Sequence, residues 1–580
     1  MRPATNLASL LATLAVLAFA GSAAAGAGMA GSGNQADPAQ RLANGAVASA
    51  HPLATRAGRE VLANGGNAFD AAVAVSAALA VVEPYSSGLG GGGFWLLHTR
   101  DGLDVMVDGR EEAPSEASPT MYQNDAGEVI DGASINGPRA AGVPGEPAAL
   151  AHIADEYGDL GLERTLAPAI RYAREGFEVG ATYRRLAEFR RDVLRRHSRA
   201  AEIFLSHGEV PEAGAVLRQP ALADTLERLA EKGRAGFYQG PVAAELARST
   251  RAAGGLISRE DLADYRVRER DPVTAEVAGH RIVSAAPPSS GGVALVQILR
   301  MLRAADYGDA EGVHRTHLLV EGMRRAYRDR AVHLGDTDFV DVPVARLISR
   351  PYNAGLAATI HPRRALPSDY LPGPPAARKQ GRDTTHFSVI DGEGNRVAAT
   401  LSINYPFGSG FVAGDTGVVL NDEMDDFVAK PGVPNAYGLV GGEANAIAPG
   451  KRPLSSMSPT FVTGPEVTLI TGTPGGSRII TMVTRAVAGM IWDEGGTAAL
   501  EHWVARPRYH HQYRPDAIQH EPDTFTEAER RALAERGHNF EAVGRRFGDM
   551  QAILWQRDDG ELKVAADPRG EGKAVEVSEE

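Results

Sequence analysis

The sequence predicts an α/β protein built as a layered sandwich, with strands enclosed between helices. Two observations support this prediction. Up to about residue 370 the apolar residues recur mainly with helical spacing, and from Thr385 onward they alternate along short segments, as in strands. Helical spacing returns near the C-terminal end, and strands flanked by helices on both sides are accommodated best in stacked layers.

The part of the chain before residue 370 is expected to be mostly helical. The segment 71–82 is apolar throughout, is too short to cross a membrane and ends before Pro84, so we expect a core helix there. The other helices expected in this part cover 55–63, 146–157, 166–175, 220–232 and 313–334.

A β-hairpin is expected directly after Thr384. Strands over 385–391 and 397–405 flank the turn Gly392-Glu393-Gly394-Asn395. The remaining elements expected are strands over 418–421 and 467–471 and helices over 477–492 and 526–536, the last with a capping box formed by Thr526 and Glu529. The charged tail from Gly570 is expected to be frayed.

Length and composition exclude several classes of function. A chain of 580 residues allows about two to four domains, or one large layered domain. The net charge of −13 argues against nucleic acid and anionic membranes as partners. The chain contains no cysteine, which excludes thiol catalysis and cysteine-based metal sites.

The N-terminal segment has the features of a signal peptide. Arg2 precedes an apolar run of 14 residues, 7–20, and Ala23-Ala24-Ala25 offers a cleavage site. The run is too short for a membrane-spanning helix. We therefore expect residues 1–25 to be removed and the protein to be exported, periplasmic or secreted, without a membrane anchor.

Thr384 stands where the two patterns meet, after a Pro/Gly/Arg-rich stretch over 370–383 that is expected to be an exposed linker. A threonine hydroxyl is a poor nucleophile until a base takes its proton. Cleavage between Asp383 and Thr384 would create an α-amine with a pKa of roughly 7.7–8.0, which can act as that base. Four residues at a strand start are also consistent with an ordinary structural threonine.

Three polar groups could bind a charged ligand, and each also has a structural interpretation. Arg110 could clamp a carboxylate or form a structural ion pair. Ser455 and Ser456 could donate hydrogen bonds to a carboxylate or belong to a Ser/Pro-rich loop. The acidic cluster 421–427 could bind an ammonium group or a metal, or it could be a solvated loop.

Backbone and strand-borne groups add further candidates. Ser402 and Asn404 are expected on one face of a strand, either in a site or on a polar outer face. The N–H groups of Gly475-Gly476, at the start of a helix, suit an oxyanion hole. The glycines 90–93 suit an anion-binding nest or, more simply, close packing beside a strand. His510-His511 would face opposite sides of a strand, so we expect no metal there.

Together these motifs resemble the γ-glutamyltransferase (γ-glutamyl transpeptidase) family, over about residues 42–569. The motifs that carry the resemblance are Asn64-Gly65-Gly66-Asn67, 90–93, Arg110-Glu111, Thr384-Thr385-His386, 421–427, 453–456 and 474–478. The resemblance implies an N-terminal-nucleophile hydrolase fold, which is a four-layer αββα sandwich. It also implies a precursor that cuts itself into a large subunit, 26–383, and a small subunit, 384–580.

The resemblance implies a role for each site residue. Thr384 is the nucleophile, Ser402 assists it at a position where many relatives have threonine, and Tyr437 belongs to a lid loop, 431–441, that closes over the substrate. The other implied roles are binding of the α-carboxylate by Arg110, Ser455 and Ser456, binding of the α-ammonium by Asn404, Glu423 and Asp426, and stabilisation of the oxyanion by Gly475 and Gly476.

The implied reaction transfers the γ-glutamyl group of glutathione, or of another γ-glutamyl compound, through an acyl-enzyme. Water or an amino acid or dipeptide acceptor then takes the acyl group, and no metal or cofactor is needed. A competing interpretation is a cephalosporin (glutaryl) acylase, against which Asp426 argues, because a buried carboxylate needs a cation to meet. A third interpretation is a non-catalytic exported protein that binds amino acids. The intact Thr384 and Gly475-Gly476 argue against it.

Overall fold

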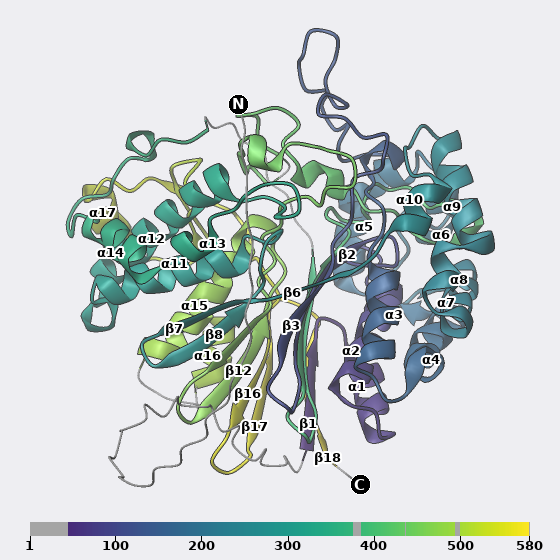
Figure 1. Ribbon diagram of the computed structural model, residues 1–580, viewed down its shortest axis with the longest axis horizontal. Helices are drawn as coiled ribbons and strands as arrows, with labels where there is room; N and C mark the ends of the chain where they lie inside the picture. The colour runs from purple at the N-terminus through teal and green to yellow at the C-terminus, as the bar shows by residue number, and fades with distance from the viewer. Residues whose placement is uncertain (1–43, 375–383, 436, 494–498, 579–580) are drawn as a thin grey trace, which may run out of the picture. The chain divides into compact units, whose positions relative to one another are not determined.

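Two antiparallel sheets lie face to face between two layers of helices, as the computed structural model shows for residues 44–374, 384–435, 437–493 and 499–578 (Figure 1). The αββα arrangement expected from the resemblance is therefore confirmed. Among the helices of these ranges, none combines the length and the apolar character that crossing a membrane requires.

The first sheet has seven strands, with the hairpin that follows Thr384 at its centre. Both hairpin strands are buried along their whole length. The strand order is β18 (Lys573–Ser578), β1 (Asn44–Ser49), β9 (Thr385–Ile390), β10 (Arg396–Ser402), β2 (Gly92–His98), β3 (Asp104–Gly109) and β6 (Arg268–Arg270).

The second sheet has six strands and packs against the first through β12 and β16, which contact β9. Its order is β17 (Leu562–Ala566), β16 (Gln551–Gln556), β12 (Val467–Gly472), β11 (Thr460–Thr463), β8 (His280–Ser284) and β7 (Val273–Val277). Two smaller sheets consist of β13 (Tyr509–His510), β14 (Ile518–His520) and β15 (Phe540–Ala542), and of β4 (Phe177–Glu178) and β5 (Val216–Leu217).

The helices of the first layer cover the outer face of the seven-stranded sheet through α1, α2 and α3. The predicted core helix is confirmed as α2, in which every residue is buried and Asn67 and Asp70 form a capping box. This layer comprises α1 (Pro52–Ala63), α2 (Ala68–Val82), α3 (Glu146–Glu156), α4 (Gly161–Glu175), α5 (Ala181–Leu194), α6 (Ser198–Phe204), α7 (Pro220–Lys232), α8 (Arg234–Tyr238), α9 (Gly240–Ala252) and α10 (Arg259–Asp264).

The second layer covers the six-stranded sheet through α11, α15 and α16, and α12 packs on α11. It comprises α11 (Gly291–Ala304), α12 (Gly312–His333), α13 (Val344–Leu347), α14 (Arg350–Ala358), α15 (Ile479–Trp492), α16 (Leu500–Ala505) and α17 (Glu527–Glu535). The capping box predicted for α17 is present between Thr526 and Glu529.

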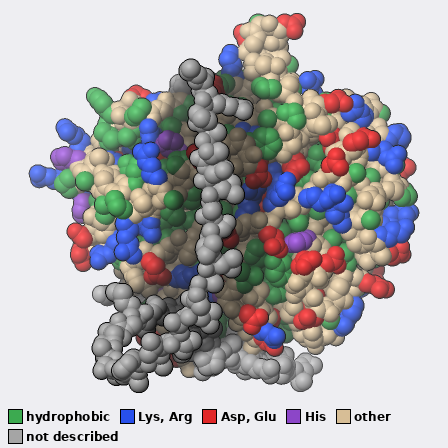
Figure 2. All heavy atoms as spheres, in the orientation of Figure 1, with side chains coloured by type: hydrophobic (Ala, Val, Ile, Leu, Met, Phe, Trp, Pro, Cys, Tyr) green, Lys and Arg blue, Asp and Glu red, His purple; other side chains and the backbone are tan. Residues whose placement is uncertain are grey.

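The charges of this strongly acidic chain are distributed rather than gathered on the face seen in Figure 2. Acidic and basic side chains are interspersed over its right-hand part, which the first helical layer forms in Figure 1. Helices of this layer also carry ion pairs, such as those of Arg174 with Asp224 and Glu227. That part of the surface therefore presents no large field of one sign.

Some sequence predictions were wrong. The tail after Gly570 is not frayed, because β18 pairs with β1 along its whole length. The segment 418–421 is no strand and forms only an isolated bridge between Val412 and Val419. The early strands β1–β3 were missed, because strands buried on both faces lack the alternation that identifies a strand.

The glycines 90–93 allow close backbone packing, as the simpler interpretation predicted. A Cβ atom on Gly90 would lie 1.9 Å from the Val419 carbonyl oxygen, and one on Gly91 would lie 2.1 Å from that of Ser402. No side chain fits at these positions. The run thus brings β2 against the ends of the segments that carry Ser402 and the acidic cluster.

Candidate active site

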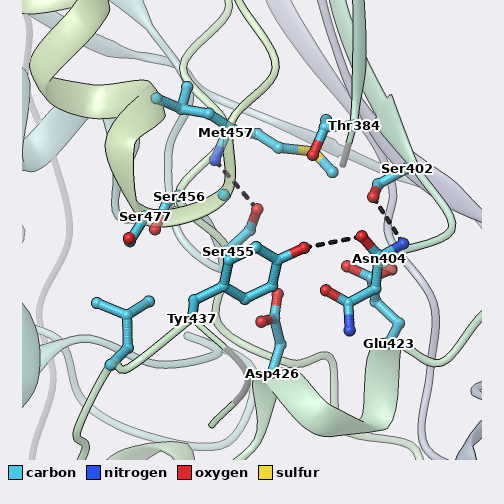
Figure 3. A pocket seen from close by; sticks show the side chains of 13 residues that line it. Thr384, Ser402, Asn404, Glu423, Asp426, Tyr437, Ser455, Ser456, Met457 and Ser477 are labelled. Atoms are coloured by element: carbon cyan, nitrogen blue, oxygen red, sulfur yellow. Dashed lines mark hydrogen bonds between the residues drawn. The ribbon is translucent and has the colours of Figure 1, made fainter. Parts of the chain in front are cut away.

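A pocket with about 280 Å³ of empty space, part of which is open to solvent, lies where β9, β10 and the turn after β12 meet (Figure 3). Nine of the eleven residues predicted for the site line it, whereas Arg110 and Gly475 do not. Asp383 lies outside the described residues. The lining comprises Thr384, Ser402, Asn404, Glu423, Asp426, Tyr437, Leu439, Ser455, Ser456, Met457, Gly476, Ser477 and Ile479.

Thr384 reaches the pocket because it immediately precedes β9 in the centre of the sheet. The next residue, Thr385, is fixed by a hydrogen bond of 2.8 Å from its hydroxyl to the Glu83 carboxylate. The nearby His386 does not serve as a base for Thr384, because its ring nitrogens contact Thr400 and Ser388 instead. Burial also lowers the pKa of His386 to about 3.

Asn404 occupies a backbone conformation that suits asparagine. The strand β10 ends at Ser402, so the expected strand up to 405 is too long, and Asn404 has a left-handed φ of 72°. The Ser402 hydroxyl oxygen accepts a hydrogen bond of 2.7 Å from the Asn404 N–H, and the Asn404 side chain donates to the Asp422 carbonyl at 2.9 Å. Ser402 and Asn404 line the pocket together, although they do not share a strand.

The acidic cluster is buried, not solvated. Glu423 and Asp426 belong to a short 3-10 helix, Glu423–Asp426, and both accept hydrogen bonds from Arg110, that to Asp426 at 2.6 Å. Burial raises the pKa of both carboxyls, and the Arg110 guanidinium opposes that shift. Glu111 lies 3.7 Å from Arg110, and burial raises its pKa to about 8.

Arg110 is fully buried and lies behind the acid pair. Its Nε donates to the Pro453 carbonyl at 3.3 Å, so it also supports the loop that carries the two serines. The structural ion pair that sequence analysis offered as an alternative for Arg110 is therefore present. Its predicted contact with a substrate carboxylate stays a prediction.

The two serines present hydroxyl groups to the pocket (Figure 3). The Ser455 hydroxyl accepts a hydrogen bond of 3.1 Å from the Met457 N–H. The Ser456 hydroxyl accepts one of 3.2 Å from Arg330, which sequence analysis missed. Arg330 lies in α12, whose sequence contains several arginines, and nothing in the pattern sets it apart.

The turn between β12 and α15 requires its glycines. Gly475 and Gly476 have φ values of 141° and 58°, which disfavour other residues. A Cβ atom on Gly476 would lie 2.1 Å from the Tyr437 ring. The Tyr327 hydroxyl donates a hydrogen bond to the Ser477 carbonyl and holds the turn from α12.

The expected lid segment contributes Tyr437 and Leu439 to the lining of the pocket. The Tyr437 hydroxyl donates to the Asn404 carbonyl at 2.8 Å (Figure 3). The Gln512 amide donates to the Gly438 carbonyl at 3.1 Å, and its oxygen accepts from the Ser477 hydroxyl at 2.7 Å. The segment is thus attached both to the β10 side of the pocket and to the glycine turn.

The four layers, with a threonine at the start of a central strand, define the N-terminal-nucleophile hydrolase fold. Comparison with known proteins specifies the family. Residues 54–577 match the gamma-glutamyltranspeptidase family, and the chain belongs to it. Its relatives at this level of similarity are enzymes of the γ-glutamyltransferase and hydrolase class, and so is this protein.

Two relatives show how much of the chain is shared. A glutathione hydrolase proenzyme of Escherichia coli is 42% identical over 540 residues, covering 91% of each chain. One of Pseudomonas aeruginosa is 43% identical over 550 residues, covering 93% of this chain and 96% of the relative. A solved cephalosporin acylase from Bacillus halodurans matches with a TM-score of 0.78 and 28% identity, covering 92% of this chain and 96% of its own.

Proposed function

We propose that the protein is an exported glutathione hydrolase and γ-glutamyltransferase that matures by cleavage between Asp383 and Thr384. The observation that carries the proposal is the convergence of a nucleophile, an acid pair and two serines on one pocket. The family supplies the substrate class, since relatives carry the name glutathione hydrolase. Residues 1–25 would direct export.

The proposed reaction begins with the Thr384 hydroxyl and its own α-amine. The amine takes the hydroxyl proton while the oxygen attacks the γ-carbonyl carbon of the donor. The N–H groups of Gly475 and Gly476 would stabilise the oxyanion. The C–N bond then breaks, the proton passes to the leaving amine, and the γ-glutamyl ester of Thr384 remains.

The second half of the proposed reaction returns the enzyme to its starting state. Water or the amine of an amino acid or dipeptide attacks the ester carbonyl, and the Thr384 oxygen regains its proton. Ser402 would support the Thr384 hydroxyl, and Tyr437 in the closed lid would keep bulk water out. No step requires a metal or a cofactor.

Donor recognition would depend on charge at the other end of the pocket. The α-ammonium would meet Asp426, Glu423 and Asn404, and the α-carboxylate would meet Ser455, Ser456 and the remaining N–H groups of Arg110. The acid pair favours a zwitterion because a donor without an ammonium leaves buried carboxylates facing its own carboxylate.

The proposal is tested by incubating the purified mature protein with glutathione, with and without glycylglycine. We expect glutamate release in both cases and a γ-glutamyl-glycylglycine product when the acceptor is present. An acylase is the second candidate, favoured by the fold match to the Bacillus halodurans enzyme. Efficient turnover of a glutaryl anilide, without turnover of glutathione, would establish the acylase instead.

A further inference from the structure

Two buried arginines in different electrostatic situations lie behind residues that line the pocket, Arg110 behind Asp426 and Arg330 behind Ser456. Arg110 is surrounded by three carboxylates, those of Glu111, Glu423 and Asp426. Its charge is therefore already balanced by the protein. An incoming carboxylate must compete with these acids for Arg110.

Arg330 is buried as deeply but has no such partner. Only 5% of its surface is exposed, and both acceptors of its hydrogen bonds are neutral hydroxyls, Ser290 at 2.9 Å and Ser456 at 3.2 Å. No carboxylate in the described part of the chain forms an ion pair with it. Burial lowers its pKa, which Tyr327 and Asp426 oppose. Asp426, which already pairs with Arg110, is the carboxylate that acts on Arg330 from a distance. A buried cation that no carboxylate contacts directly is costly unless a ligand supplies the anion.

The contact with Arg330 fixes the direction of the Ser456 hydroxyl. A guanidinium only donates hydrogen bonds, so the Ser456 oxygen must accept, and its single hydrogen points elsewhere. Ser456 lines the pocket, so that hydrogen is available to a ligand. The Ser455 hydroxyl accepts from Met457 and likewise retains its own hydrogen for donation.

Ser290 connects Arg330 to the same loop. Its hydroxyl accepts from the Arg330 Nε and donates to the Ser455 carbonyl at 2.6 Å. Arg330 therefore supports both serines, one through its hydroxyl and the other through its backbone. The serine pair is prepared as a set of two donors with a positive charge directly behind it.

We propose that Arg330 is a positioning residue that makes Ser456 a hydrogen-bond donor and supplies the unbalanced positive charge for the α-carboxylate of the donor substrate. This inference rests on the proposed function, because it names the group that receives one end of the γ-glutamyl zwitterion. In this proposal the substrate α-carboxylate interacts with Arg330 as well as with Arg110, and the α-ammonium interacts with Asp426.

The test compares two donors that differ only in the α-carboxylate. γ-Glutamyl-p-nitroanilide carries it, whereas 4-aminobutanoyl-p-nitroanilide lacks it and retains the ammonium. In Arg330→Gln we expect kcat/KM for the first to fall about 10- to 100-fold, the loss expected for a charge-assisted hydrogen bond, mainly through KM. For the second donor we expect a change below about threefold. Arg330→Lys, which keeps the charge, should give an intermediate loss.

Two further proteins separate this role from a structural one. Arg396→Gln is the matched control, since Arg396 is also buried, donates only to a backbone carbonyl and lies at the opposite end of β10. We expect it to leave the preference between the two donors unchanged. In the Arg330→Gln/Ser456→Ala double variant, the loss should not exceed the larger single loss, because the two residues act as one unit.

Three outcomes decide the inference. An equal loss on both donors would show that Arg330 only supports the fold, and no loss would remove it from carboxylate binding. If turnover of the second donor is too slow, the inhibition constants of glutamate and 4-aminobutanoate give the same comparison. If the wild type accepts only a glutaryl anilide, the proposed function fails. The role of Arg330 is then tested by measuring whether Arg330→Gln lowers kcat/KM more for the glutaryl anilide, which carries a carboxylate, than for the butanoyl anilide, which lacks it.

Discussion

At the residue scale, Asp426 separates the two candidate donors. One oxygen accepts from Arg110 at 2.6 Å and the other from the lid residue Asn435 at 3.2 Å. The carboxylate is thus held in place at the pocket wall before any ligand arrives. Its charge is suited to an ammonium group and unfavourable for a donor that carries only a carboxylate.

Asp426→Asn keeps the shape of this side chain and removes its charge. We expect kcat/KM for a γ-glutamyl anilide to fall by one to two decades, about the value of a charge-assisted hydrogen bond. Turnover of a glutaryl anilide should rise, because the unmatched carboxylate is gone. The ratio of kcat/KM for the two donors is the measurement. A ratio equal to that of the wild type would remove Asp426 from contact with the ammonium, and altered folding cannot produce opposite effects.

At the element scale, the lid is attached by Gln512. Its amide lies within 3.3 Å of the carbonyl oxygens of Tyr437, Gly438 and Arg514. Its oxygen accepts from Ser477 and contacts His510. The lid backbone and the glycine turn are therefore connected through one buried side chain.

Gln512→Glu keeps the size of the side chain and replaces the amide donor with a second acceptor. We expect the lid to open, because a carboxylate among three carbonyls has no hydrogen to donate. Chymotrypsin should then cleave faster within 431–441, and kcat/KM should fall roughly 5- to 100-fold. Gln219→Glu makes the same change at a buried amide that donates to the Val81 carbonyl in the first helical layer. If both variants resist the protease equally, Gln512 does not hold the lid.

Helices α2 and α3 are joined by a buried acid. The Ser76 hydroxyl contacts the Glu146 carboxyl, and burial raises the pKa of Glu146 to about 8. The folded protein therefore holds a proton that the unfolded chain releases near pH 4.5. The stabilisation that the proton on Glu146 gives the folded protein is fully present below about pH 4.5 and is lost as the pH rises towards 8.

Glu146→Gln replaces this proton-holding acid with a neutral side chain. The wild type should lose up to about 1.4 kcal/mol for each pH unit across this window through Glu146, and the variant should not. Denaturant unfolding at pH 5.5 and pH 8 gives the comparison, and the variant should be the more stable protein at pH 8. Identical pH dependence in the two proteins would mean that Glu146 is ionised in the folded state.

At the scale of the whole molecule, the chain on both sides of Thr384 builds both sheets. The strands β1, β2 and β3 pair in one sheet with β9, β10 and β18, and β7 and β8 pair in the other with β11 and β12. Neither segment forms one of these two large sheets alone. We therefore expect the two proposed subunits to remain together after cleavage.

Maturation is expected to produce two polypeptides in a denaturing gel, the smaller beginning Thr-Thr-His-Phe, and one particle in native chromatography. Thr384→Ala should remain a single inactive chain, because the attacking hydroxyl is missing. N-terminal sequencing and activity measurements check both points. If purified Thr384→Ala still breaks at this bond, the cleavage is not autocatalytic.

The sequence by itself determined the layered α/β class, and its resemblance to the γ-glutamyltransferase family implied the αββα order and nine of the residues that line the pocket. Strong local signals explain the predicted elements, such as the apolar run of α2, the hairpin turn after Thr384 and the turn at glycines 475 and 476, whose backbone no other residue fits. The pairing of β18 was missed, because a polar edge strand resembles a frayed tail until its partner is known.

Only the tertiary structure decided which charges are balanced. The sequence singled out Arg110 and not Arg330, and it did not reveal that Arg110 meets three carboxylates whereas Arg330 meets two hydroxyls. It also decided that the acidic cluster is buried and that Gln512 reaches the lid. The physical reason is that ion pairing and burial depend on contacts between segments hundreds of residues apart. A local sequence pattern does not show which distant segments come into contact.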